Sequence, residues 1–171
     1  GHAYLPASAR VAPPPGAPPE AALSGAWLGP LGPRLETPGA LAGRTLRRHG
    51  ARPTGVARPF AGQPLQGFSG LAAAPAEGGG VWTVTDNGFG ARANSRDFMP
   101  MIVRQSLDWR TGAATAEEVI FLSDPHRRLP FAIAWEGTAA RHLTGADVDP
   151  ESVQRLGGGF WNGDEFGPAL V

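Results

Sequence analysis

Acidic side chains are concentrated in one turn-rich stretch near the end of the chain. Residues 143–168 read LTGADVDPESVQRLGGGFWNGDEFGP and hold five of the fifteen acidic residues. Carboxylate oxygens on irregular loops are the ligands that hard cations prefer, and calcium takes about six to eight such oxygens. Asp149 and Glu151 flank a proline that stiffens the link, so both carboxylates can face one ion. The five acidic residues are Asp147, Asp149, Glu151, Asp164 and Glu165.

Two further candidate ligands come from an earlier part of the chain. Asp86 and Asn87 directly follow a β-branched run, at the point where a strand is expected to end. For each residue taken singly, an Asx turn or a loop cap remains the alternative to a ligand role. The predicted metal ligands are Asp149, Glu151, Asp164, Asp86 and Asn87, with calcium as the expected ion.

Serine chemistry has weaker support in this sequence. Residues 67–71 read GFSGL, which resembles a nucleophile elbow, but Leu71 stands where the G-x-S-x-G motif requires glycine. None of the four histidines can be tied to Ser69 from the sequence, and no two of them have metal-ligand spacing. Ser69 is therefore interpreted as a small strand residue whose hydroxyl bonds to backbone.

A basic segment offers a candidate anion site. Residues 124–128 read DPHRR, and guanidinium groups match phosphate oxygens with two parallel hydrogen bonds. The predicted substrate-binding residues are His126, Arg127 and Arg128. An exposed polar loop is the alternative interpretation of the same segment.

An internal repeat indicates how these residues are positioned. In the first unit, a Leu-x-Gly motif at 65–67 is followed by GGGVW at 78–82 and DNGFG at 86–90. In the second unit, a Leu-x-Gly motif at 143–145 is followed by GGGFW at 157–161 and DEFG at 164–167. Each unit reads as strand, glycine-rich turn, aromatic strand and acidic loop. Recurrence of such a unit at long spacing is typical of a β-propeller, in which loops of successive blades converge.

Short apolar runs between turn residues predict an all-β fold with an antiparallel meander. Expected strands are 40–46, 68–74, 81–85, 99–107, 118–122 and 131–135. The fold prediction is a partial β-propeller with about one full blade and part of the next. Residues 1–38 form a Pro/Gly/Ala-rich lead-in that we expect to be extended or disordered, and residues 39–171 form the propeller part. A half-built second blade would leave an unpaired edge, so we expect a longer parent protein.

The composition excludes several classes of function. The formal net charge is zero, which gives no support for binding to nucleic acid or to an anionic membrane. The chain has no cysteine, so disulfides and thiolate sites are excluded. No run approaches the length of a membrane span, and no segment has the pattern of a signal peptide, so any such peptide has been removed.

Four ordered segments resemble the phytase-like family, described as having esterase-like activity of phytase. They are QPLQGFSGL at 63–71, VTDNGFGARANSRDF at 84–98, LTGADVDPES at 143–152 and GFWNGDEFGP at 159–168. The resemblance covers about residues 60–171. It implies a β-propeller, export from a bacterium to the periplasm or the cell exterior, and in some members a fused phosphodiesterase domain. Additional C-terminal blades are expected on the same ground.

The resemblance also implies an activity. By analogy with calcium-dependent propeller phytases, we predict hydrolysis of small-molecule phosphoesters by a metal-activated water. Glu151, Asp164 and Glu165 are the predicted catalytic residues. The alternative is a non-catalytic propeller module that binds a ligand or partner and uses calcium for rigidity. A metal-free carboxylesterase that uses Ser69 is a third possibility.

Overall fold

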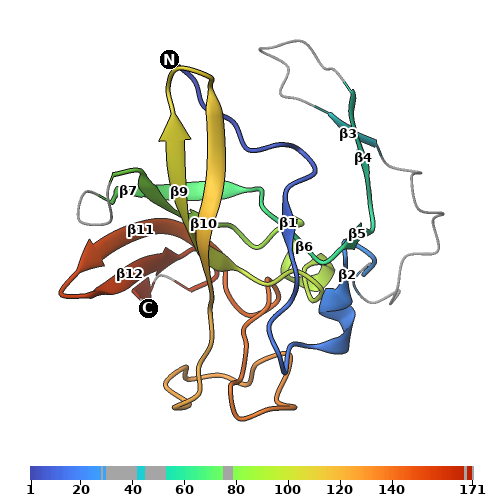
Figure 1. Ribbon diagram of the computed structural model, residues 1–171. Coiled ribbons are helices and arrows are strands. Elements are labelled where there is room, and N and C mark those ends of the chain that lie inside the picture. Colours follow the sequence, from blue (N-terminus) through green and yellow to red (C-terminus); the bar gives the residue numbers. More distant parts are fainter. Residues whose placement is uncertain (28, 30–41, 45–52, 75–78, 168, 171) are drawn as a thin grey trace.

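Antiparallel β-sheets make up the structure of this chain, which is a computed structural model (Figure 1). The structure describes residues 1–27, 29, 42–44, 53–74, 79–167 and 169–170. The 3-10 helices that lie wholly within these residues are η1 (Pro19–Ala22) and η5 (Arg92–Asn94). No described helix is long and apolar enough to cross a membrane. The all-β prediction is confirmed.

A four-stranded meander forms the centre of the fold. Its strands are β7 (Phe68–Ala73), β8 (Val81–Thr85), β9 (Met101–Asp108) and β10 (Ala113–Phe121), in the spatial order β10-β9-β8-β7. The four consecutive strands expected between residues 68 and 122 are confirmed, and β8 has the predicted bounds. β10 begins five residues earlier than predicted, because the turn at Gly112 has a φ of 75° and lets Ala113 pair at once with Asp108.

A second antiparallel sheet covers one face of this meander. It contains β11 (Pro150–Leu156), β12 (Gly159–Asp164) and β13 (Ala169–Leu170), and β11 lies against β7 and β8. The approach is close because β7 presents glycine there: a Cβ at Gly70 would lie 2.6 Å from the Val153 nitrogen. Trp82 is buried in the interface, with its ring 4.8 Å from that of Phe160. Burial of these aromatic and aliphatic groups holds the two sheets together.

The opposite face of the meander is covered by the N-terminal segment. Leu5, Ala9 and Val11 pack against a core that includes Met101 and Val103. The short strands here are β1 (Arg10–Val11) with β6 (Gln63–Pro64), β2 (Leu23–Ser24) with β5 (Phe60–Ala61), and β3 (Ala42–Arg44) with β4 (Pro53–Ala57).

Residues 1–27 of the lead-in hold the 3-10 helix η1 and the short strands β1 and β2, which pair with β6 and β5. The expectation of an extended or disordered lead-in over residues 1–38 stays a prediction. The predicted boundary between residues 38 and 39 lies outside the described residues. The strand expected at 40–46 is described only at 42–44, where β3 lies.

The strand predicted at 131–135 is wrong. Its apolar residues are used in a loop: Ile133 is buried with Leu143 and Val148. The backbone N–H of Ala134 donates to a carboxylate oxygen of Asp147 at 2.6 Å, in place of a strand partner. Apolar periodicity over five residues does not distinguish a strand from a loop that covers a small core.

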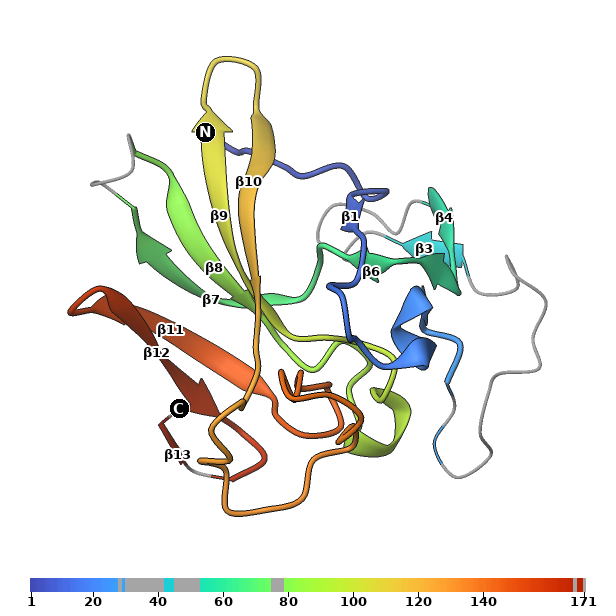
Figure 2. The same cartoon turned by 60° about the horizontal axis from the view of Figure 1, so that its bottom comes forward.

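The loops that carry the candidate site lie at one end of both sheets. β7, β9 and β11 begin at this end, and β8, β10 and β12 finish there, as the pairs Phe68–Thr85, Met101–Phe121 and Pro150–Asp164 show. Segments 86–100, 122–149 and 165–167 therefore gather below the sheets (Figure 2). The arrangement of the sheets as blades of a propeller remains a prediction.

Candidate functional site

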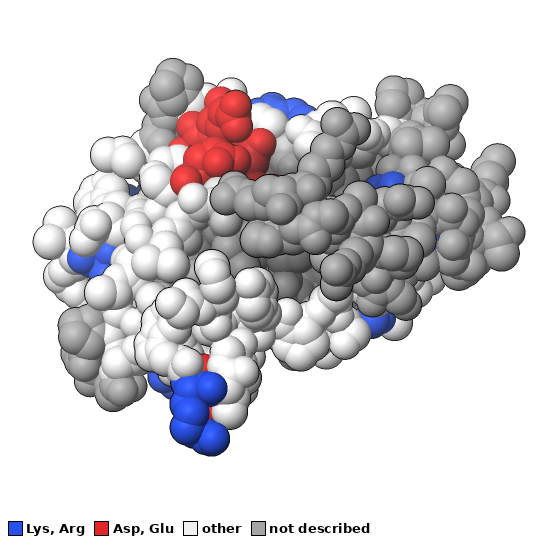
Figure 3. Space-filling model, turned by 90° about the horizontal axis from the view of Figure 1, so that it is seen from above, with Lys and Arg blue, Asp and Glu red and all other residues white. Residues whose placement is uncertain are grey.

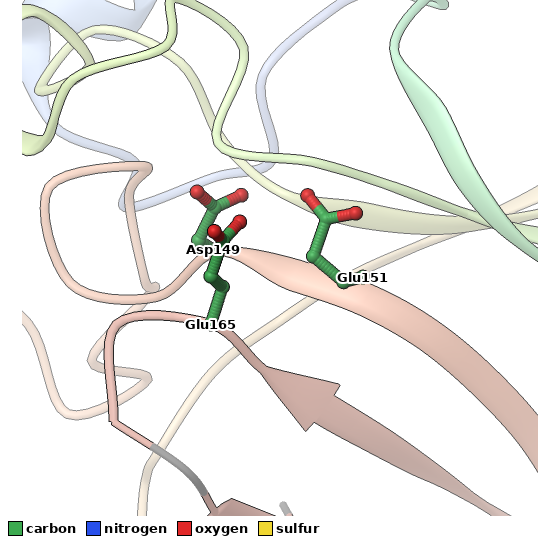
Figure 4. A group of neighbouring side chains, drawn as sticks. All are labelled: Asp149, Glu151 and Glu165. Carbon is green, nitrogen blue, oxygen red and sulfur yellow. The ribbon is translucent and has the colours of Figure 1, made fainter.

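Three carboxylates from two chain segments meet at this end of the second sheet. One oxygen each of Asp149, Glu151 and Glu165 lies within 4.8 Å of the others. Asp149 and Glu151 come from the start of β11 and Glu165 from the turn after β12, and all three carboxylates point to the same side of the ribbon (Figure 4). Asp149 is buried and the two glutamates are exposed. We call these three residues the acidic triad.

A β-bulge shapes the start of β11. Pro150 pairs with Asp164 and Ser152 pairs with Gly163, which leaves Glu151 as an extra residue without a partner on β12. Bulges turn side chains out of the regular alternation of a strand and are frequent beside active sites. The equivalent bulge in β7 lies at Ser69, between the pairs Phe68–Thr85 and Gly70–Val84. The internal repeat seen in the sequence therefore extends to this detail of the backbone.

Asn87 fixes the buried member of the triad. Its backbone N–H donates to Oδ1 of Asp149 at 2.9 Å, and its side-chain amide donates to Oδ2 at 3.0 Å. The amide oxygen of Asn87 accepts the N–H of Gly90 at 2.9 Å, so the loop after β8 is closed at the same point. Asn87 thus lies directly after a strand, as the sequence predicted, and its N–H donors are directed at Asp149. Its predicted role as a metal ligand stays a prediction.

Asp164 and Asp86 are engaged in turns. Oδ1 of Asp164 accepts the N–H of Asp149 at 2.7 Å, and Oδ2 accepts that of Gly167 at 3.2 Å. Asp86 accepts the N–H of Gly88 at 2.7 Å. The contacts with Gly167 and Gly88 are those of the Asx-turn alternative, whereas the contact with Asp149 joins two segments. They place Asp164 next to the triad as a positioning group, and its ligand and catalytic roles stay predictions.

The carboxylates of the site repel one another. Burial raises the pKa of Asp149, and the neighbouring charges of Glu151, Glu165 and Asp164 raise it further, against the opposing hydrogen bond from Asn87. The pKa of Asp86 is raised mainly by burial, with a contribution from the charge of Asp149. Acidic side chains also gather into one patch on the face of the molecule seen in Figure 3.

These residues fit a hard cation. Each triad member offers a carboxylate oxygen, and oxygen ligands at an irregular loop are what calcium requires. A divalent ion would relieve the mutual repulsion that raises the pKa of Asp149. Three carboxylates are fewer than the six to eight ligands that calcium usually takes, so backbone carbonyls and waters would complete the set.

The predicted anion-binding residues belong to a separate part of the loop between β10 and β11. The guanidinium of Arg127 lies 3.3 Å from a carboxylate oxygen of Glu136, and the backbone N–H of Arg128 donates to Asp124 at 2.6 Å. The side chain of His126 is exposed. None of the contacts described for these three residues reaches the acidic triad. Their role in substrate binding stays a prediction.

A buried ion pair that sequence patterns did not predict holds this loop. Arg141 is 3% exposed; it donates to the carbonyl oxygen of Asp124 at 2.9 Å, pairs with the Asp124 carboxylate at 3.3 Å and also binds Glu136. Burial opposes ionisation of Asp124, but hydrogen bonds from Arg128, Leu129 and Arg141 outweigh it and hold its pKa below the usual value. Partners seventeen residues apart carry no periodic signal that a sequence pattern could reveal.

Comparison with known proteins places the chain in a family. Searches of curated proteins and of solved structures gave no significant match. A profile of the phytase-like family, described as esterase-like activity of phytase, matches residues 63–171, which is well over half of the chain and includes every residue of the acidic triad. The chain therefore belongs to the phytase-like family.

Proposed function

We propose that this chain is part of a phosphoester hydrolase whose active site is the acidic triad with bound calcium. The observation that carries the proposal is the convergence of Asp149, Glu151 and Glu165 within 4.8 Å, in a chain of the phytase-like family. We further propose that the two stacked sheets are neighbouring blades of a β-propeller, with β7 and β11 as adjacent inner strands. Export to the periplasm or the cell exterior follows from the family resemblance and is part of the same proposal.

The residues have different roles in this proposal. Asp149, Glu151 and Glu165 hold the ion, while Asn87 and Asp164 keep the Asp149 segment in place through the hydrogen bonds already described. Asp86 adds negative charge beside Asp149. When bound, calcium neutralises phosphate charge and lowers the pKa of water.

The exposed glutamates supply the proton chemistry. Glu151 and Glu165 reach solvent, whereas both oxygens of Asp149 accept hydrogen bonds from Asn87. A glutamate oxygen accepts a proton from the attacking water as the new P–O bond forms. The ester P–O bond breaks, and the proton passes to the leaving alcohol.

A calcium titration followed by thermal unfolding tests the site. Calcium that binds only the folded state must raise the Tm as its concentration increases. We expect this increase for the parent chain and its loss in the double variant Asp149→Asn/Glu151→Gln. The matched control is Glu117→Gln/Glu118→Gln on β10, which removes the same charge from two exposed carboxylates outside the site. Equal calcium responses in the parent and in the site variant would refute the site.

Turnover is tested with a panel of phosphoesters. We expect phosphate release by the parent chain that depends on calcium, and loss of this release in the site variant but not in the β10 control. A Ser69-directed organophosphonate probe distinguishes the serine mechanism, because only a reactive serine would be labelled. Ser69 is exposed at the bulge of β7, so a probe can reach it. Labelling together with calcium-independent ester cleavage would favour the carboxylesterase instead.

One observation favours the non-catalytic alternative enough to keep it. The triad joins the start of β11 to the turn after β12, and Asn87 ties the loop after β8 to the same point. An ion there would cross-link three segments and stabilise the fold without any chemistry. An increase in Tm with calcium, combined with no phosphate release from any ester, would support this binding module.

A further inference from the structure

An arginine that the sequence patterns did not single out packs against the residue that directly follows the acidic triad in the chain. Arg92 belongs to η5, in the loop between β8 and β9, and its guanidinium carbon lies 4.4 Å from the ring centroid of Phe166. Phe166 is the residue that follows Glu165 of the triad. The other described contacts between an arginine and an aromatic ring have distances of 5.5–5.9 Å, so this contact is the closest of them.

Both partners of this contact are anchored to the site. The N–H of Phe166 donates to Oδ1 of Asp164 at 3.4 Å, and the loop that carries Arg92 is tied to Asp149 through Asn87. A guanidinium that stacks on an aromatic face keeps the N–H donors at its edge available for an anion. The side chain of Arg92 is exposed, so a ligand in solvent can reach it.

Arg92 has no carboxylate partner among the described ion pairs, whereas three other arginines do. Arg127 and Arg141 share Glu136, and Arg96 pairs with Glu20 at 3.3 Å. In the described part of the chain no ion pair joins a carboxylate to Arg92, and its ring partner Phe166 directly follows Glu165. A phosphate group that approaches the triad is repelled by three carboxylates, so a positive group at the edge of the cluster would offset part of this repulsion.

We propose that Arg92 is a substrate-binding residue that donates hydrogen bonds to the phosphoryl oxygens of the ester, with Phe166 holding the guanidinium in position. The proposal rests on the phosphoester hydrolase function proposed above. It identifies the phosphoryl group, rather than the alcohol part of the ester, as the portion of the substrate that this loop recognises.

Calorimetric titration with inorganic phosphate at a fixed calcium concentration tests this role directly. We expect Arg92→Ala to weaken phosphate binding by about 10- to 100-fold, the usual loss for a charge-assisted hydrogen bond. Arg92→Lys keeps the charge but not the planar fork, so its affinity should lie between those of the parent and the alanine variant. The matched control is Arg110→Ala, because Arg110 is equally a solvent-exposed arginine but lies in the β9–β10 turn at the other end of the sheet.

The outcomes separate the two proposals. Phosphate binding that is equal in the parent, Arg92→Lys and Arg92→Ala overturns the role of Arg92, and so does a parent chain that binds calcium but no phosphate. If the parent hydrolyses phosphoesters and Arg92→Ala keeps full phosphate affinity, only the role of Arg92 fails. If phosphate binding depends on Arg92 while no ester is hydrolysed, the anion site stands and the hydrolase function fails. Calcium binding followed through the Tm should be retained in Arg92→Ala, which shows that this variant is folded.

Discussion

Replacing Asn87 by aspartate tests the electrostatics of the site with almost no change of shape. The amide nitrogen of Asn87 donates to Oδ2 of Asp149 at 3.0 Å, and Asn87→Asp puts an acceptor oxygen at that position. Two full charges at this distance repel each other by about 5–6 kcal/mol at an effective dielectric constant of about 20. The pair can avoid this cost by keeping one proton between the two carboxyl groups.

Protonation sets an upper limit on the loss of stability. Holding a proton at pH 7 on a carboxyl with an ordinary pKa of about 4 costs about 4 kcal/mol, and at pH 5 about 1.4 kcal/mol. Solvent around the exposed Glu151 and Glu165 screens the charges, so these values are maxima. The folded state of the variant binds the proton more tightly than the unfolded chain does, so the pKa of the pair is raised. Its stability relative to the parent is therefore highest below about pH 4 and is lost as the pH rises through the raised folded pKa.

Urea denaturation at pH 5 and pH 7, with a chelator present, measures this loss. We expect Asn87→Asp to lose about 2–3 kcal/mol more stability at pH 7 than at pH 5, relative to the parent. Asn87→Ala is the control: it also removes the amide donor to Asp149, together with the acceptor of the Gly90 N–H, but it adds no charge, so its loss should change little with pH. Added calcium should then stabilise Asn87→Asp more than the parent. A loss that is the same at both pH values would refute the assigned contact between Asn87 and Asp149.

Three more substitutions test the framework of the site. In Gly145→Ala the added carbon would overlap the carbonyl oxygen of Asn87, so we expect a lower Tm and weaker calcium binding in the same titration. Arg141→Met removes the partner of buried Asp124, a carboxyl whose pKa is held low in the folded state. We expect the parent to be more stable than the variant in urea at pH 7. This difference should shrink as the pH falls through the folded pKa of Asp124. Gly70→Ala places a carbon 2.6 Å from a backbone nitrogen of β11, so it should lower the Tm by separating the two sheets, and an unchanged Tm would contradict their close packing.

Much of the architecture follows from local patterns. The run from Val81 to Thr85 predicted β8 to the residue, because β-branched and aromatic side chains favour a strand, and this central strand is buried on both faces. The strand expected at 131–135 is a loop, and of its apolar side chains Ile133 packs with Leu143 and Val148. A short apolar run shows that burial occurs but not which backbone conformation achieves it.

The sequence singled out the carboxylates that the structure brings together, and their role as a functional site stays a prediction. Asp149 and Glu151 meet as expected from their spacing around a proline, and Glu165 joins them because Asp164 and the β11–β12 pairing bring the turn after β12 alongside. Arg92 was not predicted as a binding residue, because nothing near it in the sequence indicates an anion site. Its position is defined by Phe166, seventy-four residues later in the chain.

The sequence alone determined the class of the fold, the repeated strand-turn-strand unit and the donor chemistry, since these depend on residue type, period and spacing. Tertiary structure decided which carboxylates share one site, which of them serve as turn residues, and which cations lie beside them. The physical reason is that hydrogen bonds and charge interactions act over a few ångströms in space, whereas sequence patterns report only neighbours along the chain. Asn87 and Asp149 are sixty-two residues apart in the chain, yet the backbone nitrogen of Asn87 lies 2.9 Å from Oδ1 of Asp149. The packing of β11 against β7 and β8 brings their segments together.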